Sequence, residues 1–218
     1  MDQRHPALTP SIAGGYREAA SVCLNRHHVS PIDVHLSDNG TNSAAEMAWT
    51  APDQRISGAW ANAIDTTEAG AYGCVIAGLE ALRQMFAVRR AETGTGADYY
   101  VGPKGAGEDD LENCFRLEVS GLSDGDQKAV AKRLIEKVQQ AQRGNSNLPA
   151  VAGVIGFSTK LIMFKDVPEA KLKVNHGLPV MGTTTTTSPA NGGGISVRRT
   201  STSRLCSAFA TRSRRWAR

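Results

Sequence analysis

Hydrophobic and polar positions along the chain predict alternating helices and strands up to about residue 167. Apolar residues recur at helical spacing in segment 14–28, which predicts a helix. Strict alternation over 31–37 and a second strand-like run over 44–50 enclose the turn dipeptide Asn39-Gly40. These two runs therefore predict a β-hairpin.

A long helical pattern covers residues 52–90, as one helix or two consecutive ones. Asp65 is a plausible N-cap for the second helix, because Glu68 follows three residues later as in a capping box. Glu68 also lies at the N-terminal end of one apolar stripe at helical spacing. That stripe consists of Tyr72, Val75, Leu79, Leu82 and Phe86.

The segment 96–122 contains two short strand-like runs that flank a Gly-rich, acidic loop. Each run carries one carboxylate among apolar neighbours, Asp98 in the first and Glu118 in the second. A clear amphipathic helix follows over about 123–144, and the runs 148–157 and 160–167 predict two further strands. The pattern as a whole predicts an α/β domain with a small mixed sheet flanked by helices.

Length and composition favour a single soluble domain. The chain has 218 residues with 40% apolar and 6% aromatic residues, which is enough for one core. We expect a flexible N-terminus over 1–12, one α/β domain over 13–169 and a disordered, basic, low-complexity tail over 170–218. No apolar run reaches the length of a membrane span, and the N-terminus lacks the order of a signal peptide, so we expect a cytoplasmic protein without membrane contact.

Charge is distributed unevenly along the chain. The segment 170–218 holds nine of the 25 basic residues and no acidic residue, so residues 1–169 have 16 basic and 21 acidic residues and a net charge of about −5. The tail either meets nucleic acid through its arginines or is an unselected sequence resembling a shifted reading frame of GC-rich DNA.

The order of elements over residues 66–157 resembles the restriction-endonuclease-like superfamily, also called PD-(D/E)XK. In that family a helix that often carries a Glu precedes a strand with an Asp, a strand with (D/E)-x-K, a second helix and another strand. The resemblance places Asp98 and Glu118 at the two metal-binding acids and Glu68 at the helix acid. It implies an Mg²⁺ site, since this hard ion prefers carboxylate oxygens and substrate phosphate.

The lysine of the family motif is absent from its usual place, where this chain has Ser120. In some relatives the following helix supplies the lysine. Lys128 and Lys137 both flank the apolar stripe of that helix, whereas Lys132 points to solvent. We expect Lys128 to replace the missing lysine, because it follows the Glu118 strand most closely.

Two classes of function stay open at this point. The first is a metal-dependent nuclease, or an inactive nuclease-derived homologue, that acts on nucleic acid, and the resemblance implies a setting in defence or mobile elements. The second is a non-catalytic α/β domain that binds a protein partner, which the acidic body and Ser120 favour. In that second view Glu118 shares a water-facing strand face with Arg116, and capping alone explains Glu68. The two views differ in whether Asp98 and Glu118 meet at one concave surface.

Overall fold

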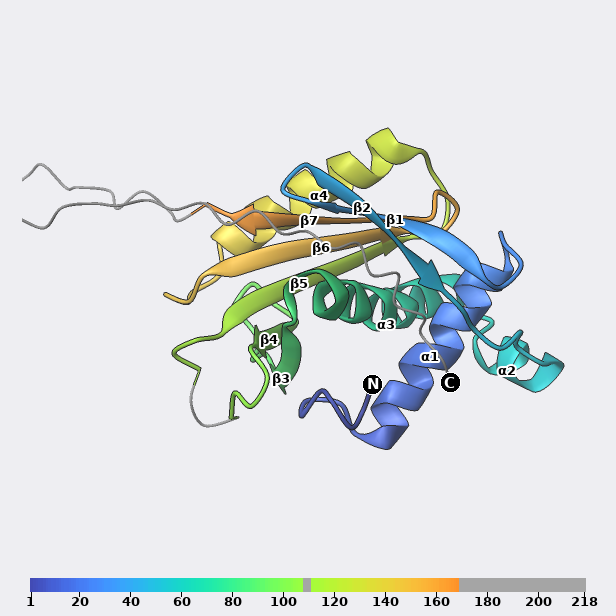
Figure 1. Ribbon diagram of the computed structural model, residues 1–218, viewed down its shortest axis with the longest axis horizontal. Helices are drawn as coiled ribbons and strands as arrows, with labels where there is room; N and C mark the ends of the chain where they lie inside the picture. Colours follow the sequence, from blue (N-terminus) through green and yellow to red (C-terminus); the bar gives the residue numbers. More distant parts are fainter. Residues whose placement is uncertain (108–110, 169–218) are drawn as a thin grey trace, which may run out of the picture. The chain divides into compact units, whose positions relative to one another are not determined.

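The computed structural model describes residues 1–107 and 111–168, so the predicted tail over 170–218 lies outside the described residues. Figure 1 shows helices packed on a mixed, open seven-stranded sheet. The helices are α1 (Pro10–Asn25), α2 (Gln54–Ala59), α3 (Ala63–Arg83) and α4 (Gln127–Gln142). The strands are β1 (Ile32–Asp38), β2 (Thr41–Met47), β3 (Phe86–Arg90), β4 (Tyr99–Gly102), β5 (Phe115–Leu122), β6 (Ala150–Gly156) and β7 (Leu161–Val167).

The predicted hairpin is confirmed. Strands β1 and β2 pair antiparallel from Ile32↔Met47 to Asp38↔Thr41, which leaves Asn39 and Gly40 as a two-residue turn. Their φ angles are 50° and 89°, as a type I′ turn requires, and Asn and Gly are the residues that adopt such angles at least cost. The hairpin forms one end of the sheet, with β1 parallel to β7.

The other half of the sheet is a meander followed by a crossover. Strands β3, β4 and β5 pair antiparallel in turn, and α4 then carries the chain to β6, which is parallel to β5. The predicted strands 148–157 and 160–167 are confirmed as β6 and β7, an antiparallel pair. The sheet order is β2-β1-β7-β6-β5-β4-β3.

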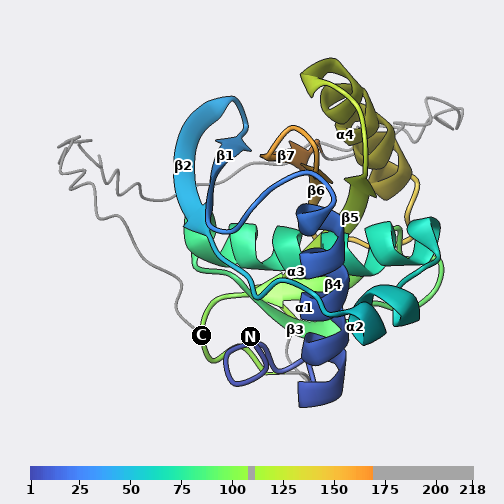
Figure 2. The ribbon, with the colours of Figure 1, turned by 90° about the vertical axis from the view of Figure 1, so that its right-hand side faces the viewer.

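Helices cover both faces of the sheet (Figures 1 and 2). Helices α1 and α3 pack together on one face, where Val75 and Leu79 of α3 join Leu117 and Val119 of β5 in the main core. Helix α4 covers the other face through an apolar cluster that includes Val130, Leu134, Val138 and the β6 residues Ala152 and Val154. Alternate residues of β5 therefore point toward α3 and toward α4.

The helical pattern over 52–90 resolves into α2, α3 and strand β3, so the expected boundaries need correction. Asn62, not Asp65, caps α3, because its side chain accepts hydrogen bonds from the backbone N–H groups of Ile64 and Asp65. The helix ends at Gln84, which takes a left-handed conformation with φ of 54°. The segment Phe86–Arg90 then forms β3, although its Phe continues the apolar stripe of the helix.

The N-terminal segment, which we expected to be flexible, is instead packed into the domain. His5 is fully buried and Leu8 is 2% exposed. The Nε2 of His5 lies 2.9 Å from Oε2 of Glu80, and the backbone N–H of Ala7 donates to the carbonyl of Ala87 at 3.1 Å. These contacts attach residues 1–9 to the end of α3 and to β3.

The cysteines follow the expectation from their wide spacing. Cys23 and Cys74 are buried free thiols, Cys114 is also buried, and Cys206 lies outside the described residues. Burial raises the pKa of the Cys74 thiol to about 12, so this group is unreactive near neutral pH. Within the described ranges, no helix combines the length and the apolar character needed to cross a membrane.

Candidate functional site

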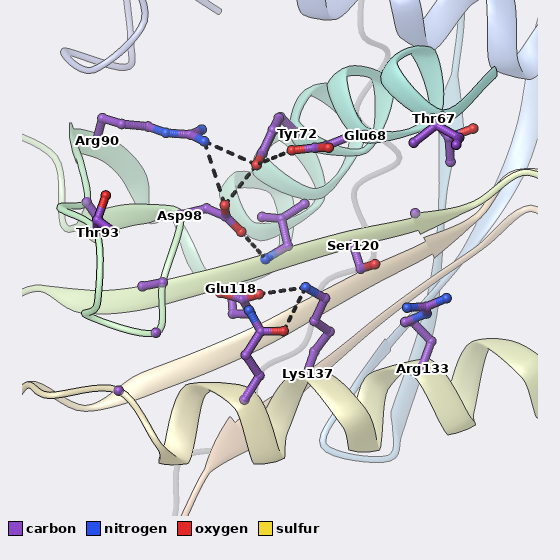
Figure 3. A pocket seen from close by; sticks show the side chains of 18 of the residues that line it. Thr67, Glu68, Tyr72, Arg90, Thr93, Asp98, Glu118, Ser120, Arg133 and Lys137 are labelled. Carbon is purple, nitrogen blue, oxygen red and sulfur yellow. Dashed lines mark hydrogen bonds and ion pairs between the residues drawn. The ribbon is translucent and has the colours of Figure 1, made fainter. Parts of the chain in front are cut away.

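A cavity of about 1040 Å³ runs along the edge of β5 beyond the end of β4. Strand β4 pairs only with Phe115–Leu117 of β5, whereas β6 accompanies the other edge of β5 up to Leu122. The edge from Glu118 to Leu122 is therefore left without a strand on the β4 side. Figure 3 shows α3 on one side of this edge and α4 on the other.

Asp98 lies at this edge, immediately before β4. Its backbone N–H donates to the carbonyl of Leu117 at 2.8 Å, so Asp98 continues the β4–β5 register opposite Glu118. Its carboxylate accepts two further bonds of 2.8 Å, from the Tyr72 hydroxyl to Oδ1 and from the Val119 N–H to Oδ2. An Arg90 nitrogen is 3.7 Å from Oδ1. These partners fix the Asp98 carboxylate in the wall of the cavity.

Glu118 points from β5 toward α4 and is 3% exposed. The Nζ of Lys137 donates to Oε1 of Glu118 at 2.7 Å and to Oε1 of Gln140 at 3.1 Å. Burial raises the pKa of Glu118, the Lys137 hydrogen bond opposes this shift, and the negative charge of Asp98 adds to it. Asp98 and Glu118 both line the cavity, and their negative charges repel each other.

Glu68 also lines the cavity, from the first half of α3. The Tyr72 hydroxyl lies 3.2 Å from Oε1 of Glu68, so Tyr72 connects this carboxylate with Asp98. Glu68 makes no capping box with Asp65, because the cap of α3 is Asn62. The three predicted acids, Glu68, Asp98 and Glu118, therefore share one cavity.

The carboxylates of the cavity leave open only a metal that needs few protein ligands. Across residues 1–107 and 111–168, no group of three or more His, Cys, Asp or Glu side chains could hold a metal ion. Mg²⁺ commonly needs only one or two carboxylates, since it keeps waters and binds substrate phosphate. Glu118 Oε2 has no hydrogen-bond partner among the described residues, which leaves an oxygen for such an ion.

The structure brings Lys137, not Lys128, to the Glu118 carboxylate. Lys128 is exposed in the first turn of α4 and does not line the cavity. The reason is directional: β5 and β6 are parallel, so the connecting helix α4 must run back along the sheet. The residue of α4 that meets the middle of β5 therefore comes from the second half of the helix.

The view that Arg116 and Glu118 lie on the water-facing side of a hairpin is wrong. Both residues are buried, at 6% and 3% exposure. Arg116 does not pair with Glu118, but donates to the backbone carbonyls of Leu148, Thr95 and Ala141 at 3.0, 2.6 and 3.1 Å. Helix α4 covers this face, so a polar side chain on it needs a partner inside the protein.

Tyr72 and Arg90 are parts of the site that the sequence pattern did not reveal. The guanidinium of Arg90 lies 4.6 Å from the ring centroid of Tyr72 and 4.7 Å from that of Tyr99, and it donates to the Tyr72 hydroxyl at 3.1 Å. Burial and the nearby Asp98 charge raise the pKa of Tyr72, so its hydroxyl keeps its proton and can donate to Asp98. The spacing of these residues along the chain gives no local signal for this arrangement.

Comparison with known proteins gives no further guide to this site. The chain matches no protein-family model, no curated protein and no solved structure.

Proposed function

We propose that the cavity hydrolyses phosphodiester bonds of nucleic acid with Mg²⁺, in a fold of the restriction-endonuclease-like class. One observation carries the proposal: Glu118 of β5 and Lys137 of α4 form a 2.7 Å ion pair beside Asp98. Such a group of two acids and one lysine is what the resemblance predicts, with the lysine supplied by the helix in place of Ser120.

The order of elements around the cavity supports the same proposal. Helix α3 leads into three antiparallel strands, β3, β4 and β5, and α4 then leads to the parallel strand β6. The resemblance depends on a helix, the Asp98 strand, the Glu118 strand, a second helix and a further strand, and the chain has this order with one strand more, β3, before the Asp98 strand.

The residues of this chain have separate parts in the proposed reaction. Asp98 and Glu118 would hold Mg²⁺, with Glu68 in support, and the ion when bound would activate water and stabilise charge on the leaving group. Tyr72 and the Val119 N–H orient the Asp98 carboxylate. Lys137 orients Glu118 and supplies a positive charge to a phosphate in the cavity.

A second function, binding without hydrolysis, has its own support. Asp98 already has two hydrogen-bond donors and Glu118 has Lys137, so the protein itself supplies partners to both carboxylates. A nuclease-derived domain that has lost activity would keep this cavity as a binding surface for a protein partner. The net charge of about −5 over residues 1–169 is compatible with that reading.

A cleavage assay on the full chain separates the two functions. Single- and double-stranded DNA and RNA are incubated with Mg²⁺ or Mn²⁺, beside Asp98→Asn, which keeps the size of the side chain and removes its charge. The proposal expects metal-dependent cleavage by the wild type and its loss in the variant. Cleavage, not retardation, is the readout, because the arginines of segment 170–218 would retard nucleic acid in either case.

Metal binding gives a second, independent readout. Mn²⁺ should raise the unfolding temperature of the wild type through its preference for the folded state, and should raise that of Asp98→Asn much less. Equal shifts in both proteins, together with no cleavage of any substrate, would reject the hydrolase and leave the binding function.

A further inference from the structure

One wall of the cavity carries three cations. Arg133, Lys137 and Arg143 line the cavity from α4 and its C-cap. At 1.5 Å per residue, Arg133 lies about 6 Å and Arg143 about 9 Å from Lys137 along the helix axis. Phosphates that follow one another along an extended nucleic-acid strand recur on this scale.

Arg133 and Arg143 are available to a ligand, whereas the Lys137 ammonium already donates to Glu118 and Gln140 and keeps one N–H for a phosphate. The Arg133 side chain is 42% exposed, and among the described residues it pairs with Glu136 alone, one turn away at 3.6 Å, which is a weak surface pair. Arg143 is exposed at the end of the helix. Arg90, which also lines the cavity, is instead committed to Tyr72 and Tyr99.

The opposite wall has a different character. The first turns of α3 line it with the uncharged Ala63, Ile64 and Thr67, of which Ile64 is 77% exposed, and with the carboxylate of Glu68. Ser120 and Gly121 of β5 form the floor between the walls. Figure 3 shows Thr67 on the α3 side and Arg133 with Lys137 on the α4 side of β5. The cavity thus has cations on the α4 side, whereas the α3 side combines the exposed, apolar Ile64 with one carboxylate, that of Glu68.

We propose that the cavity takes an unpaired nucleic-acid strand, with its phosphates along Arg133, Lys137 and Arg143 and its bases toward Ile64 and Thr67. This inference rests on the proposed function for the class of ligand, and it adds the strandedness and the orientation. Cations neutralise phosphates, and an exposed apolar side chain contacts the face of a base. A duplex would keep its bases paired and give the Ile64 wall no base face to contact.

The test measures binding without metal, so that it is independent of hydrolysis. The full-length protein in EDTA is titrated into fluorescein-labelled oligo-dT of about 15 nucleotides, or the matching duplex, at several salt concentrations. The variants are Arg133→Ala/Arg143→Ala, Ile64→Ala and the control Lys132→Ala/Lys165→Ala. The control removes two exposed lysines that do not line the cavity, one of them adjacent to Arg133.

The phosphate contacts predict a change in salt dependence. The slope of log K against log salt is negative, and each lost phosphate contact to a single strand reduces its magnitude by about 0.7. The slope of the double arginine variant should therefore be less steep than that of the wild type by about 1.4. The lysine control should keep the wild-type slope. Binding by segment 170–218 is common to all the proteins and cancels in this comparison. Equal slopes for the arginine variant and the control would overturn the proposal.

The base contact predicts a change in affinity without a change in salt dependence. Ile64→Ala should weaken binding of oligo-dT several-fold at every salt concentration, with an unchanged slope, and should leave duplex binding unaffected. The single-strand assignment would be overturned if Ile64→Ala bound oligo-dT as tightly as the wild type does. It would also be overturned if the wild type bound the duplex more tightly than oligo-dT. Because EDTA removes the metal, these results stand whether or not the cleavage assay succeeds. If the wild type cleaves nucleic acid but the arginine variant keeps the wild-type salt slope, the proposed function stands. The proposed position of the phosphates along Arg133, Lys137 and Arg143 is then rejected.

Discussion

The ammonium group of Lys137 lies 2.7 Å from Oε1 of Glu118, which joins the second half of α4 to the middle of β5 at the cavity. The Glu118 side chain is 4% exposed and that of Lys137 is 18% exposed. A carboxylate buried to this degree stays charged only with a partner, so the pair has both a structural and a chemical consequence.

Lys137→Met should therefore lower stability and abolish cleavage together. The change leaves Glu118 buried without its cation, and we expect the free energy of unfolding to fall by roughly 1–3 kcal/mol, less than for a fully buried pair because Lys137 reaches solvent. Lys128→Met, on the exposed first turn of the same helix, should stay within about 0.5 kcal/mol of the wild type. Urea unfolding and the cleavage assay give the two readouts.

The double variant Glu118→Gln/Lys137→Met separates the two effects. It removes both charges, so it should recover part of the stability lost in Lys137→Met, while remaining inactive. Full cleavage activity of Lys137→Met would contradict the assignment of Lys137 as the lysine of the site. Loss of cleavage in Lys128→Met would contradict it as well.

The sequence predicted the elements whose patterns are local. The Asn39-Gly40 turn specifies the β1–β2 hairpin, and the apolar spacing of Val130, Leu134 and Val138 specifies α4. The boundary between α3 and β3 was missed because Phe86 continues the helical spacing, while the left-handed Gln84 that ends the helix has no clear signature in sequence. Burial of His5 depends on Glu80, a residue that is distant in the chain.

The site was predictable only in part, for a similar reason. Asp98 and Glu118 are noticeable as single carboxylates among apolar strand residues, and the structure places both in one cavity. Choosing between Lys128 and Lys137 required the direction of α4 relative to β5, which follows from the sheet order and not from distance along the chain. Tyr72 and Arg90 meet Asp98 from α3 and β3, so only the tertiary fold brings them together.

Arg116→Lys should destabilise the domain strongly. Arg116 is 6% exposed, and its guanidinium donates to three backbone carbonyls at the end of α4 and in the neighbouring loops. Lysine has a single ammonium group and cannot reach three acceptors in a fixed fork, so buried carbonyls lose their donors. We expect a loss of roughly 2–4 kcal/mol in urea unfolding.

Arg143→Lys provides the matched control for this substitution. Arg143 is exposed, so the same chemical change there should stay within about 0.5 kcal/mol of the wild type. A similar small effect for both variants would mean that the three carbonyl bonds of Arg116 contribute little to the fold.

Removal of residues 1–8 should destabilise the protein by about 2.5–6 kcal/mol. Burial of Leu8 contributes about 1.5–3 kcal/mol, and Glu80, which is 7% exposed, would lose its contacts with Arg4 and His5 at a cost of about 1–3 kcal/mol. Chemical unfolding of the truncated protein measures this loss. Unchanged stability would support the original expectation of a flexible N-terminus.

His5 should make stability depend on pH in the mildly acidic range. Its Nδ1 accepts a hydrogen bond from the Ala87 N–H at 3.0 Å, so the folded state holds a neutral ring whose Nε2–H donates to Glu80. Burial lowers the pKa of His5 from its ordinary value of 6.5, although the Glu80 carboxylate opposes the shift, while Arg4 and the N-terminal amine add to it. The unfolded chain therefore binds the proton more readily than the folded one.

The sign of the effect follows from this difference in proton binding. The stability contributed by neutral His5 is fully present above pH 6.5 and is lost as the pH falls from 6.5 toward the lowered pKa of the folded state. Unfolding of the wild type and of His5→Gln, which cannot titrate, is compared between pH 8 and pH 5. The wild type should lose stability relative to the variant on acidification. If the difference in unfolding free energy between the wild type and His5→Gln stays constant across this range, the pKa of His5 does not change on folding. If the wild type instead gains stability relative to the variant on acidification, the folded state holds the ring in its charged form.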